Sequence, residues 1–310
     1  MKLFRMFRII LAVLSLLILM PFCNQFKGDG SDNTEIAKAS RHLEYLIPLL
    51  TFKGRPENLD MENKVTVLVN HGYVVGYSAK HKQPLWSAYR VSSSDVVLLN
   101  AREEDKYSED KTVRRVVTFD RSPSFYKDLR LPKKARSYSS DYTKSGYDRG
   151  HMTPNFAINS QYGKLPQLET FLMSNICPQT PNLNRGPWMR LEGMIYKYYA
   201  PLREQVWVIA GPIFAESGKK LKNDVDIPVP AECYMIIADH YYQRGAGLKA
   251  NIMAFKMPQT IERKAKVTEE YLFSVDDIEK LTGLNFFPQF TAQEEEEYER
   301  KKAAKLWKTK

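Results

Sequence analysis

Residues 145–154 read SGYDRGHMTP, and residues 183–192 read LNRGPWMRLE. In the first segment, His151 offers a proton acceptor beside Arg149, whose fixed positive charge can hold a phosphate group. In the second, the Asn184 side chain offers a hard oxygen ligand to a cation such as Mg²⁺, which usually keeps several of its waters. Together the two segments predict a metal-dependent site that hydrolyses phosphodiester bonds of nucleic acid.

Each segment also has an ordinary structural interpretation. A single histidine is more often structural than catalytic, and the DRGH run could be a turn in which Gly150 adopts an unusual backbone angle. Asn184 could instead cap the N-terminus of a helix, a use that competes with metal binding for one side-chain oxygen. Of the five histidines, however, only His151 lies among phosphate-binding and turn-forming residues.

A third segment, FLMSNICPQ at residues 171–179, lies between the other two. The three motifs, in this order and at this spacing, resemble the DNA/RNA non-specific endonuclease family, the endonuclease G-like branch of the ββα-metal superfamily. The motifs cover residues 145–192, and a looser similarity runs from roughly 64 to 290. The resemblance implies an α+β fold, with a central antiparallel sheet and a ββα-metal finger.

The resemblance also implies a role for each matching residue. His151 would be the general base that takes a proton from the attacking water, and Arg149 would help to hold the phosphate. Asn184 would be the one direct protein ligand to Mg²⁺ (or Mn²⁺), and Glu192 would orient a metal-bound water. Helix geometry agrees with this division, because eight residues place Glu192 about 12 Å along and about 80° around the helix from Asn184.

Two further residues match the family less closely. Arg121, within TFDRSPSFYKD at residues 118–128, would stabilise charge on the phosphate, with Arg130 and Arg136 as alternatives. Asn175 matches a position that supports the site, although a buried, hydrogen-bonded asparagine would explain it equally well.

Charge is distributed unevenly along this 310-residue, 43% hydrophobic chain, which can bury the core of one large domain. The net charge is +10, and residues 111–150 hold eleven Lys or Arg against four Asp and no Glu. Beside the predicted site, this stretch would attract a polyanion such as DNA or RNA, whereas elsewhere it would be a solvated surface. Phe125 and Tyr126 could stack on bases, or pack in the core.

The N-terminus has the layout of a secretory signal. Lys2, Arg5 and Arg8 precede an apolar run over residues 9–20, which is shorter than most membrane spans. We expect an exported protein, secreted, periplasmic or membrane-anchored, and a mitochondrial presequence is disfavoured because the run is uniformly apolar and poor in serine. No clear cleavage site follows, so a membrane tether or lipid attachment at Cys23 stays open.

Hydrophobic periodicity and turn residues predict the domain organisation. The predicted parts are a signal peptide or anchor at 1–23, a linker with a short helix at 24–63, a nuclease domain at 64–290 and a charged tail at 291–310. The short helix is expected over 35–47, ended by Pro48. Strands are expected at 65–69, 73–77, 85–91, 206–210 and 233–238, with a turn at 70–72, and helices at 188–199 and 275–281.

The remaining expectations concern cysteines and function. Cys177 and Cys233 could form a disulfide or remain buried thiols, and no Cys/His spacing indicates a structural zinc site. The predicted function is hydrolysis of DNA and RNA with little sequence preference, with a homodimer left open. The alternatives are a phosphodiesterase for nucleotides or small phosphates, and a non-catalytic nuclease-like binding module, which the presence of both His151 and Asn184 disfavours.

Overall fold

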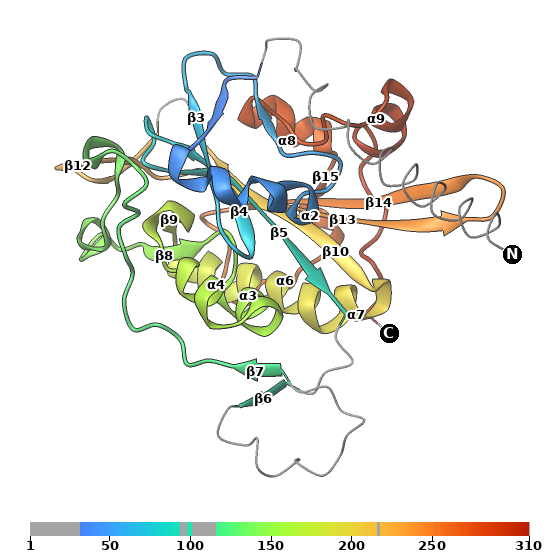
Figure 1. The fold of residues 1–310 in the computed structure, drawn as a ribbon, viewed down its shortest axis with the longest axis horizontal. Coiled ribbons are helices and arrows are strands. Elements are labelled where there is room, and N and C mark those ends of the chain that lie inside the picture. Colours follow the sequence, from blue (N-terminus) through green and yellow to red (C-terminus); the bar gives the residue numbers. More distant parts are fainter. Residues whose placement is uncertain (1–31, 94–97, 101–115, 216–217, 310) are drawn as a thin grey trace, which may run out of the picture. The chain divides into compact units, whose positions relative to one another are not determined.

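An eight-stranded sheet is the centre of the fold (Figure 1). The computed structural model describes residues 32–93, 98–100, 116–215 and 218–309. The strand order is β1-β3-β4-β5-β10-β13-β14-β15, and neighbours pair antiparallel except for the parallel pair β1 and β3. The bounds are β1 Thr34–Ile36, β3 Val65–Val69, β4 Tyr73–Ser78, β5 Gln83–Ser92, β10 Gln205–Ile213, β13 Glu232–Gln243, β14 Gly247–Pro258 and β15 Leu272–Phe273.

Both faces of this sheet are buried. In β13, Cys233 and Met235 join one apolar cluster while Tyr234 and Ile236 join another, because successive side chains of a strand point to opposite faces. Helices α3 and α5 to α7 pack on the first face, and η1, α2 and α8 pack on the second. The central strands therefore read as nearly continuous apolar runs rather than as a strict alternation.

The helices are mostly short. Their bounds are η1 Lys38–Leu46, α2 Ile47–Leu50, η3 Lys133–Ala135, η4 Ser139–Tyr142, α3 Asn155–Tyr162, α4 Lys164–Glu169, η5 Met173–Asn175, α5 Pro181–Leu183, η6 Asn184–Trp188, α6 Met189–Met194, η7 Ile195–Tyr199, α7 Ala200–Arg203, η8 Glu269–Tyr271, α8 Val275–Thr282 and α9 Ala292–Tyr298. Segments η6 and η7 are π-helical, so the predicted helix at 188–199 belongs to a longer helical run from α5 to α7.

Four two-stranded sheets complete the described strands. They pair β8 Asp148–His151 with β9 Ile176–Gln179, β2 Glu57–Asn58 with β16 Leu284–Asn285, β6 Leu98–Asn100 with β7 Val116–Thr118, and β11 Lys220–Lys222 with β12 Val225–Pro228. The β8–β9 hairpin carries two of the three sequence motifs. Together with the helical run that follows β9, it gives the ββα arrangement that the motifs predict.

The predicted strands all form, several with longer bounds, and the fold is the expected mixed α/β type with a mainly antiparallel sheet. Strand β14 was not predicted. Its sequence, GLKANIMAFKMP, alternates apolar and polar residues over 248–252 and continues as an apolar run over 252–255, so the pattern is compatible with a strand and was overlooked. The strand pairs with β13 over twelve residue pairs.

The segment that was predicted as a linker with a short helix contributes a strand to the sheet. Residues 34–36 form β1 at the edge of the sheet, and a 3₁₀ helix follows at Lys38–Leu46. Pro48 does not end this helix but lies in the first turn of α2, where a missing N–H costs nothing. The prediction of helical structure within 35–47 was correct, but the predicted start and end were wrong.

The C-terminal segment also differs from the predicted tail. Thr291 caps α9 by accepting a hydrogen bond from the backbone N–H of Glu294, and Leu306 and Trp307 pack partly buried against the first core cluster. The apolar N-terminal run at 9–20 lies outside the described residues. Among those that are described, no helix has both the length and the hydrophobicity to cross a membrane.

Candidate active site

A cleft of about 700 Å³ opens between the β8–β9 hairpin and the start of the helical run. Five of the residues predicted for the site line it: Arg121, Arg149, His151, Asn184 and Glu192. They come from a loop, from strand β8, and from η6 and α6. The structure thus brings together residues that are up to 71 positions apart in the sequence.

His151, at the end of β8, lies in an apolar surrounding and is 8% exposed. Its ring contacts Phe125 and Phe171, with centroids 5.5 and 5.2 Å away. Burial and the positive charge of Arg121 together lower the pKa of His151 to about 3, against a hydrogen bond with the Arg149 backbone that acts in the opposite direction. Nε2 is buried and has no hydrogen-bond partner among the described residues. The imidazole is therefore neutral at physiological pH, the form that can accept a proton.

Arg149 is held against aromatic rings beside His151. Its Nη2 donates to the carbonyl of Ser139 at 2.6 Å, and its guanidinium lies 5.6 Å from the centroid of Phe125 and 5.7 Å from that of Tyr142. Cation–π contact and one backbone hydrogen bond leave most of its donors free. The arginine is positioned for an anion in the cleft.

Asn184 is not a helix N-cap. Its backbone is already helical, and Thr180 caps the preceding turn by accepting a hydrogen bond from Leu183. The Asn184 Nδ2 donates to Asp148 at 2.9 Å, and among the described residues no donor bonds to its Oδ1. Fixing the amide nitrogen points the carbonyl oxygen away from Asp148, which leaves it available as a ligand.

Asp148 lines the cleft beside Asn184, and the sequence analysis did not single it out. Besides Asn184, it accepts two hydrogen bonds from Arg185, at 2.8 and 2.6 Å. Burial alone would raise the pKa of Asp148, but the hydrogen bonds from Arg185 and Asn184 outweigh it and lower the pKa. The carboxylate is thus ionised and orients the asparagine. Its position directly before Arg149 was visible in the motif, but its partner 36 residues away was not.

Glu192, in α6, lines the cleft and is half-buried. Burial raises its pKa to about 8, against the opposing effects of the Trp188 side chain and of the positive charge on Arg121. A carboxyl group with this pKa can hold or release a proton near neutral pH. It is suited to hold a water rather than to act as a permanently charged ligand.

Asn175 supports the site from behind. Its side chain is fully buried, accepts a hydrogen bond from the backbone N–H of Thr153 at 2.9 Å, and donates to the carbonyls of Thr153 and Thr170. Its own carbonyl accepts from Met152. These bonds fix the chain where it leaves His151, and Asn175 does not line the cleft.

The structure separates the three candidate arginines. Arg121 lies on the cleft with its guanidinium 5.1 Å from the Phe171 ring centroid. Arg130 is mostly buried in an ion pair with Asp128 at 2.6 Å, and Arg136 donates to two backbone carbonyls outside the cleft. Of the three, only Arg121 can reach a group bound beside His151.

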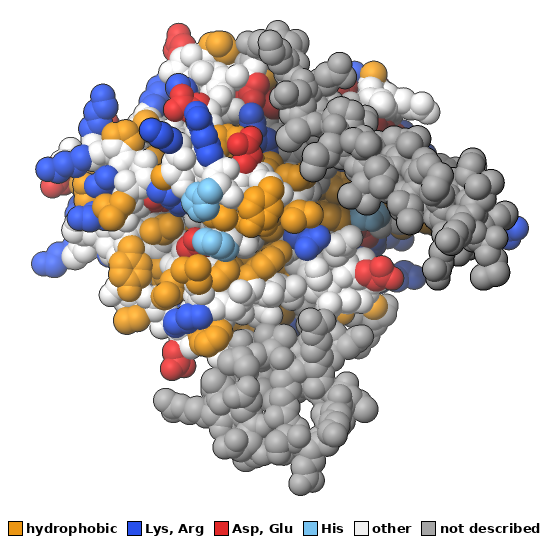
Figure 2. Space-filling model, viewed as in Figure 1, with side chains coloured by type: hydrophobic (Ala, Val, Ile, Leu, Met, Phe, Trp, Pro, Cys, Tyr) orange, Lys and Arg blue, Asp and Glu red, His pale blue; other side chains and the backbone are white. Residues whose placement is uncertain are grey.

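The basic stretch at 111–150 does not form one surface, and residues 111–115 lie outside the described part. Arg121 and Arg149 line the cleft, whereas Lys133, Lys134 and Arg136 line a separate shallow pocket with Lys82 and three aspartates. Figure 2 shows Lys and Arg side chains gathered on the left of the view, the side on which Figure 1 places β12. The basic residues of this stretch are therefore divided between the active cleft and the second pocket.

Aromatic side chains also line the cleft. Phe125 faces it, as the sequence allowed, whereas Tyr126 is 46% exposed and bonds to Ser122. Phe156 and Tyr196, which sequence reasoning missed, contact each other with centroids 4.6 Å apart at the cleft wall. No motif marks them, because they are ordinary aromatic positions on two separate helices.

Gly150 has a different role from the expected turn. It lies in strand β8 without a positive φ, and a Cβ added there would meet the Gln179 side chain at 2.2 Å. The glycine is needed for close packing of the hairpin. Behind it, Cys177 and Cys233 are buried free thiols rather than a disulfide.

Comparison with known proteins agrees with this geometry. Residues 56–293 match the model of the DNA/RNA non-specific endonuclease family. The mitochondrial nuclease EXOG of Danio rerio is 29% identical over 72% of this chain and 61% of that protein. A nuclease of Nostoc is 29% identical over 89% of this chain and 91% of its own. A crystal structure of the EndoG/EndoGI complex superposes with a TM-score of 0.55 at 24% identity, covering 74% of this chain and 88% of EndoG, and supports the fold.

These relatives overturn the predicted export. The EXOG relative is a mitochondrial protein by name, as are further EXOG and endonuclease G relatives. These relatives contradict the prediction of a secreted, periplasmic or membrane-anchored protein, which was therefore wrong. The prediction relied on residues 1–20 alone, whereas the similarity lies in the catalytic part. The chain spans about three fifths of the length of the EXOG relative.

Proposed function

The chain belongs to the DNA/RNA non-specific endonuclease family, and on that premise we propose that it hydrolyses phosphodiester bonds of DNA and RNA in the cleft around His151. One observation carries the proposal. A buried neutral imidazole and an asparagine with a free carbonyl oxygen, from two different motifs, line the same cleft as two arginines. A general base, a cation ligand and phosphate-binding charges are the parts that metal-assisted hydrolysis requires.

Each side chain has a separate role in the reaction. The neutral ring of His151, which lines the cleft, takes the proton of a water aligned with the phosphorus. Arg149 and Arg121 bind the non-bridging oxygens and stabilise the charge that grows on them as the bond to the leaving oxygen breaks. Phe125 and Phe171 fix the imidazole ring between them, so that the base needs little reorientation.

The residues present fit a hard divalent cation, for which we propose Mg²⁺ or Mn²⁺. Asn184 would hold it through Oδ1, because Asp148 fixes the amide nitrogen, and Glu192 would hold a water between itself and the cation. When bound, such an ion supplies positive charge beside the leaving oxygen. Asp148 itself is already neutralised by Arg185, which supports a positioning role rather than ligation.

Cleavage assays test this function directly. Purified full-length protein should degrade plasmid DNA and single-stranded RNA with Mg²⁺, and chelation should abolish the reaction. His151→Ala should lose about 10²–10⁴-fold in rate at saturating Mg²⁺. The matched control is His42→Ala, which removes an exposed histidine outside the cleft and should keep full activity.

Two other results would contradict the proposal. Tight DNA binding without cleavage under any metal condition would indicate a binding module. Faster hydrolysis of a nucleotide or of bis(p-nitrophenyl) phosphate than of DNA would indicate a small-molecule phosphodiesterase. A homodimer stays a prediction from the sequence.

A further inference from the structure

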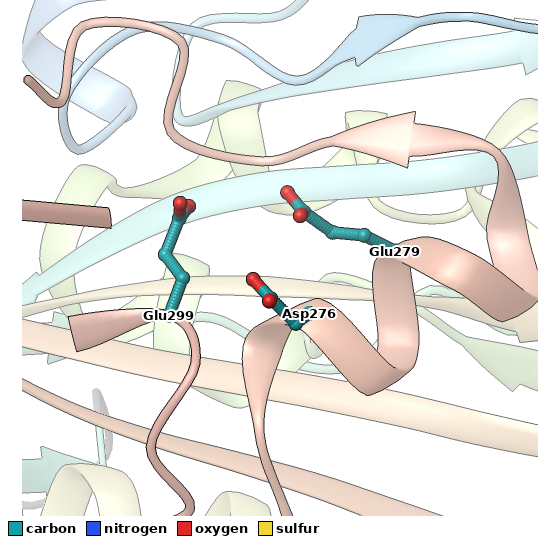
Figure 3. Close-up of side chains that lie close together, drawn as sticks. All are labelled: Asp276, Glu279 and Glu299. Atoms are coloured by element: carbon teal, nitrogen blue, oxygen red, sulfur yellow. The ribbon is translucent and has the colours of Figure 1, made fainter. Parts of the chain in front are cut away.

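Three carboxylates meet on a part of the molecule that does not line the active cleft. Asp276 and Glu279 lie in α8, and Glu299 follows α9 directly. One carboxylate oxygen from each lies within 4.8 Å of the other two. Figure 3 shows Glu279 and Glu299 pointing toward each other, with Asp276 directed into the same space.

Glu299 is the unusual member of this cluster. Its side chain is only 4% exposed, and its Oε1 is buried with no hydrogen-bond partner among the described residues. An ionised carboxylate that is removed from water without a partner costs several kcal/mol in proteins, so such groups are normally paired or bound to a metal. An unpaired buried oxygen aimed into a carboxylate cluster indicates a missing positive charge.

Among the described residues, no cationic side chain forms an ion pair with Glu279 or Glu299. The Glu279 Oε1 accepts one hydrogen bond from the backbone N–H of Phe286 at 2.8 Å. Arg300 forms a long ion pair with Asp276, at 3.8 Å from its Nε, and its Nη1 bonds to Glu296. Glu295 adds further negative charge near Glu299, and Lys280 is an opposing charge near Glu279.

We propose that Asp276, Glu279 and Glu299 bind one divalent cation, with Ca²⁺ as the best fit. All three donors are carboxylate oxygens, which hard cations prefer. The three ligand oxygens lie within 4.8 Å of one another, close enough for their side chains to converge on one ion. Ca²⁺ accepts carboxylates in flexible geometry, whereas Mg²⁺ needs a near-ideal octahedron and usually keeps several waters, so Ca²⁺ suits a site of three side-chain carboxylates better.

The site would fasten the C-terminal segment to the sheet domain. The backbone N–H of Asp276 already donates to the carbonyl of Glu299 at 3.2 Å, which brings the start of α8 against the end of α9. Without a cation, the three carboxylates repel one another across this contact. With one bound, the same groups hold α8 and α9 together, so the ion acts on stability and not on the chemistry in the cleft.

Calcium binding to the full chain tests the proposal independently of nuclease activity. Chelator-treated protein should be titrated with Ca²⁺ by calorimetry and melted with and without Ca²⁺. Glu299→Gln keeps the shape of the side chain and removes its charge. Glu296→Gln is the matched control, because it removes an exposed glutamate of α9 outside the cluster. Asn184→Ala removes the proposed ligand of the active cleft.

We expect the wild-type Tm to rise by about 5 °C when Ca²⁺ reaches about 100-fold its Kd, and Glu296→Gln to respond in the same way. Glu299→Gln should lose one bound Ca²⁺ and the Tm rise, yet melt at or above the wild-type temperature in chelator, because a repelling charge is gone. Asn184→Ala should retain both the Ca²⁺ and the Tm rise.

Three outcomes would overturn the proposal. They are a wild-type Tm that Ca²⁺ does not change, a Glu299→Gln variant that binds Ca²⁺ as the wild type does, and loss of all Ca²⁺ binding in Asn184→Ala. The first would mean that protons alone neutralise the cluster. If Glu299→Gln fails to fold, Glu279→Gln gives the same comparison, since it also removes one charge from the cluster.

Discussion

His151 should make the stability of the protein depend on pH in a predictable direction. Its pKa is about 6.5 in an unfolded chain and about 3 in the folded protein, because burial and Arg121 disfavour the charged ring. Between these values the unfolded state binds a proton that the folded state does not, so acidification favours unfolding. Lowering the pH from 7 to 4 should therefore remove about 3 kcal/mol of unfolding free energy through this one residue.

The variant His151→Leu isolates this contribution, because leucine fits between Phe125 and Phe171 and does not titrate. Urea unfolding of both proteins at pH 7, 5.5 and 4 should show the stability gap shifting by about 3 kcal/mol in favour of the variant as the pH falls. Other acid-sensitive groups, such as the Asp128–Arg130 pair, contribute equally to both proteins. His42→Leu, at an exposed histidine, should show no such shift.

A gap that changes by less than about 0.5 kcal/mol between pH 7 and pH 4 would refute this reasoning, because it would mean that folding does not lower the pKa of His151. Cleavage would then decline as the pH falls through about 6.5, because a charged imidazole cannot accept the proton of the attacking water.

Three other outcomes are expected. Asp148→Ala should release Asn184 and Arg185 and raise the Mg²⁺ concentration for half-maximal cleavage about 10–100-fold, with activity recovering at high Mg²⁺; an unchanged metal requirement would contradict the positioning role. Asn175→Ala should lower the unfolding free energy by about 2–4 kcal/mol, because it leaves buried backbone groups unpaired. A loss of less than about 1 kcal/mol, measured by urea unfolding, would contradict this. Affinity for DNA should fall steeply between low and physiological salt, and Arg121→Ala should reduce the slope of log K against log salt by about one; a salt-independent affinity would exclude electrostatic binding.

The parts of the site that the sequence predicted are those encoded by local motifs. His151, Arg149, Asn184 and Glu192 lie in two short segments, and the structure places all four on one cleft. Arg121 was ambiguous from the sequence because Arg130 and Arg136 have similar neighbours. Only tertiary contacts separate them, since Arg130 is bound by Asp128 and by groups of the β3–β4 turn.

The parts that were missed depend on contacts between distant segments. Asp148 gains its role from Asn184 and Arg185, and Phe171 from its packing on His151. Strand β14, which the sequence analysis overlooked, forms against β13 over twelve residue pairs. The location was missed for a different reason: residues 1–20 carry a generic basic and apolar pattern, which says little about a destination.

The close approach of Gly150 to Gln179 restricts how this hairpin can diverge among related proteins. A side chain at position 150 would occupy the space of the Gln179 amide, 2.2 to 2.6 Å away, and Gln179 is itself fully buried and in contact with Cys233. Neither position can change freely while the other stays as it is. In an alignment of relatives we expect the two to covary, with a larger residue at 150 accompanied by a smaller one at 179. A mutational search for altered nucleases would reach such sequences only by paired substitutions.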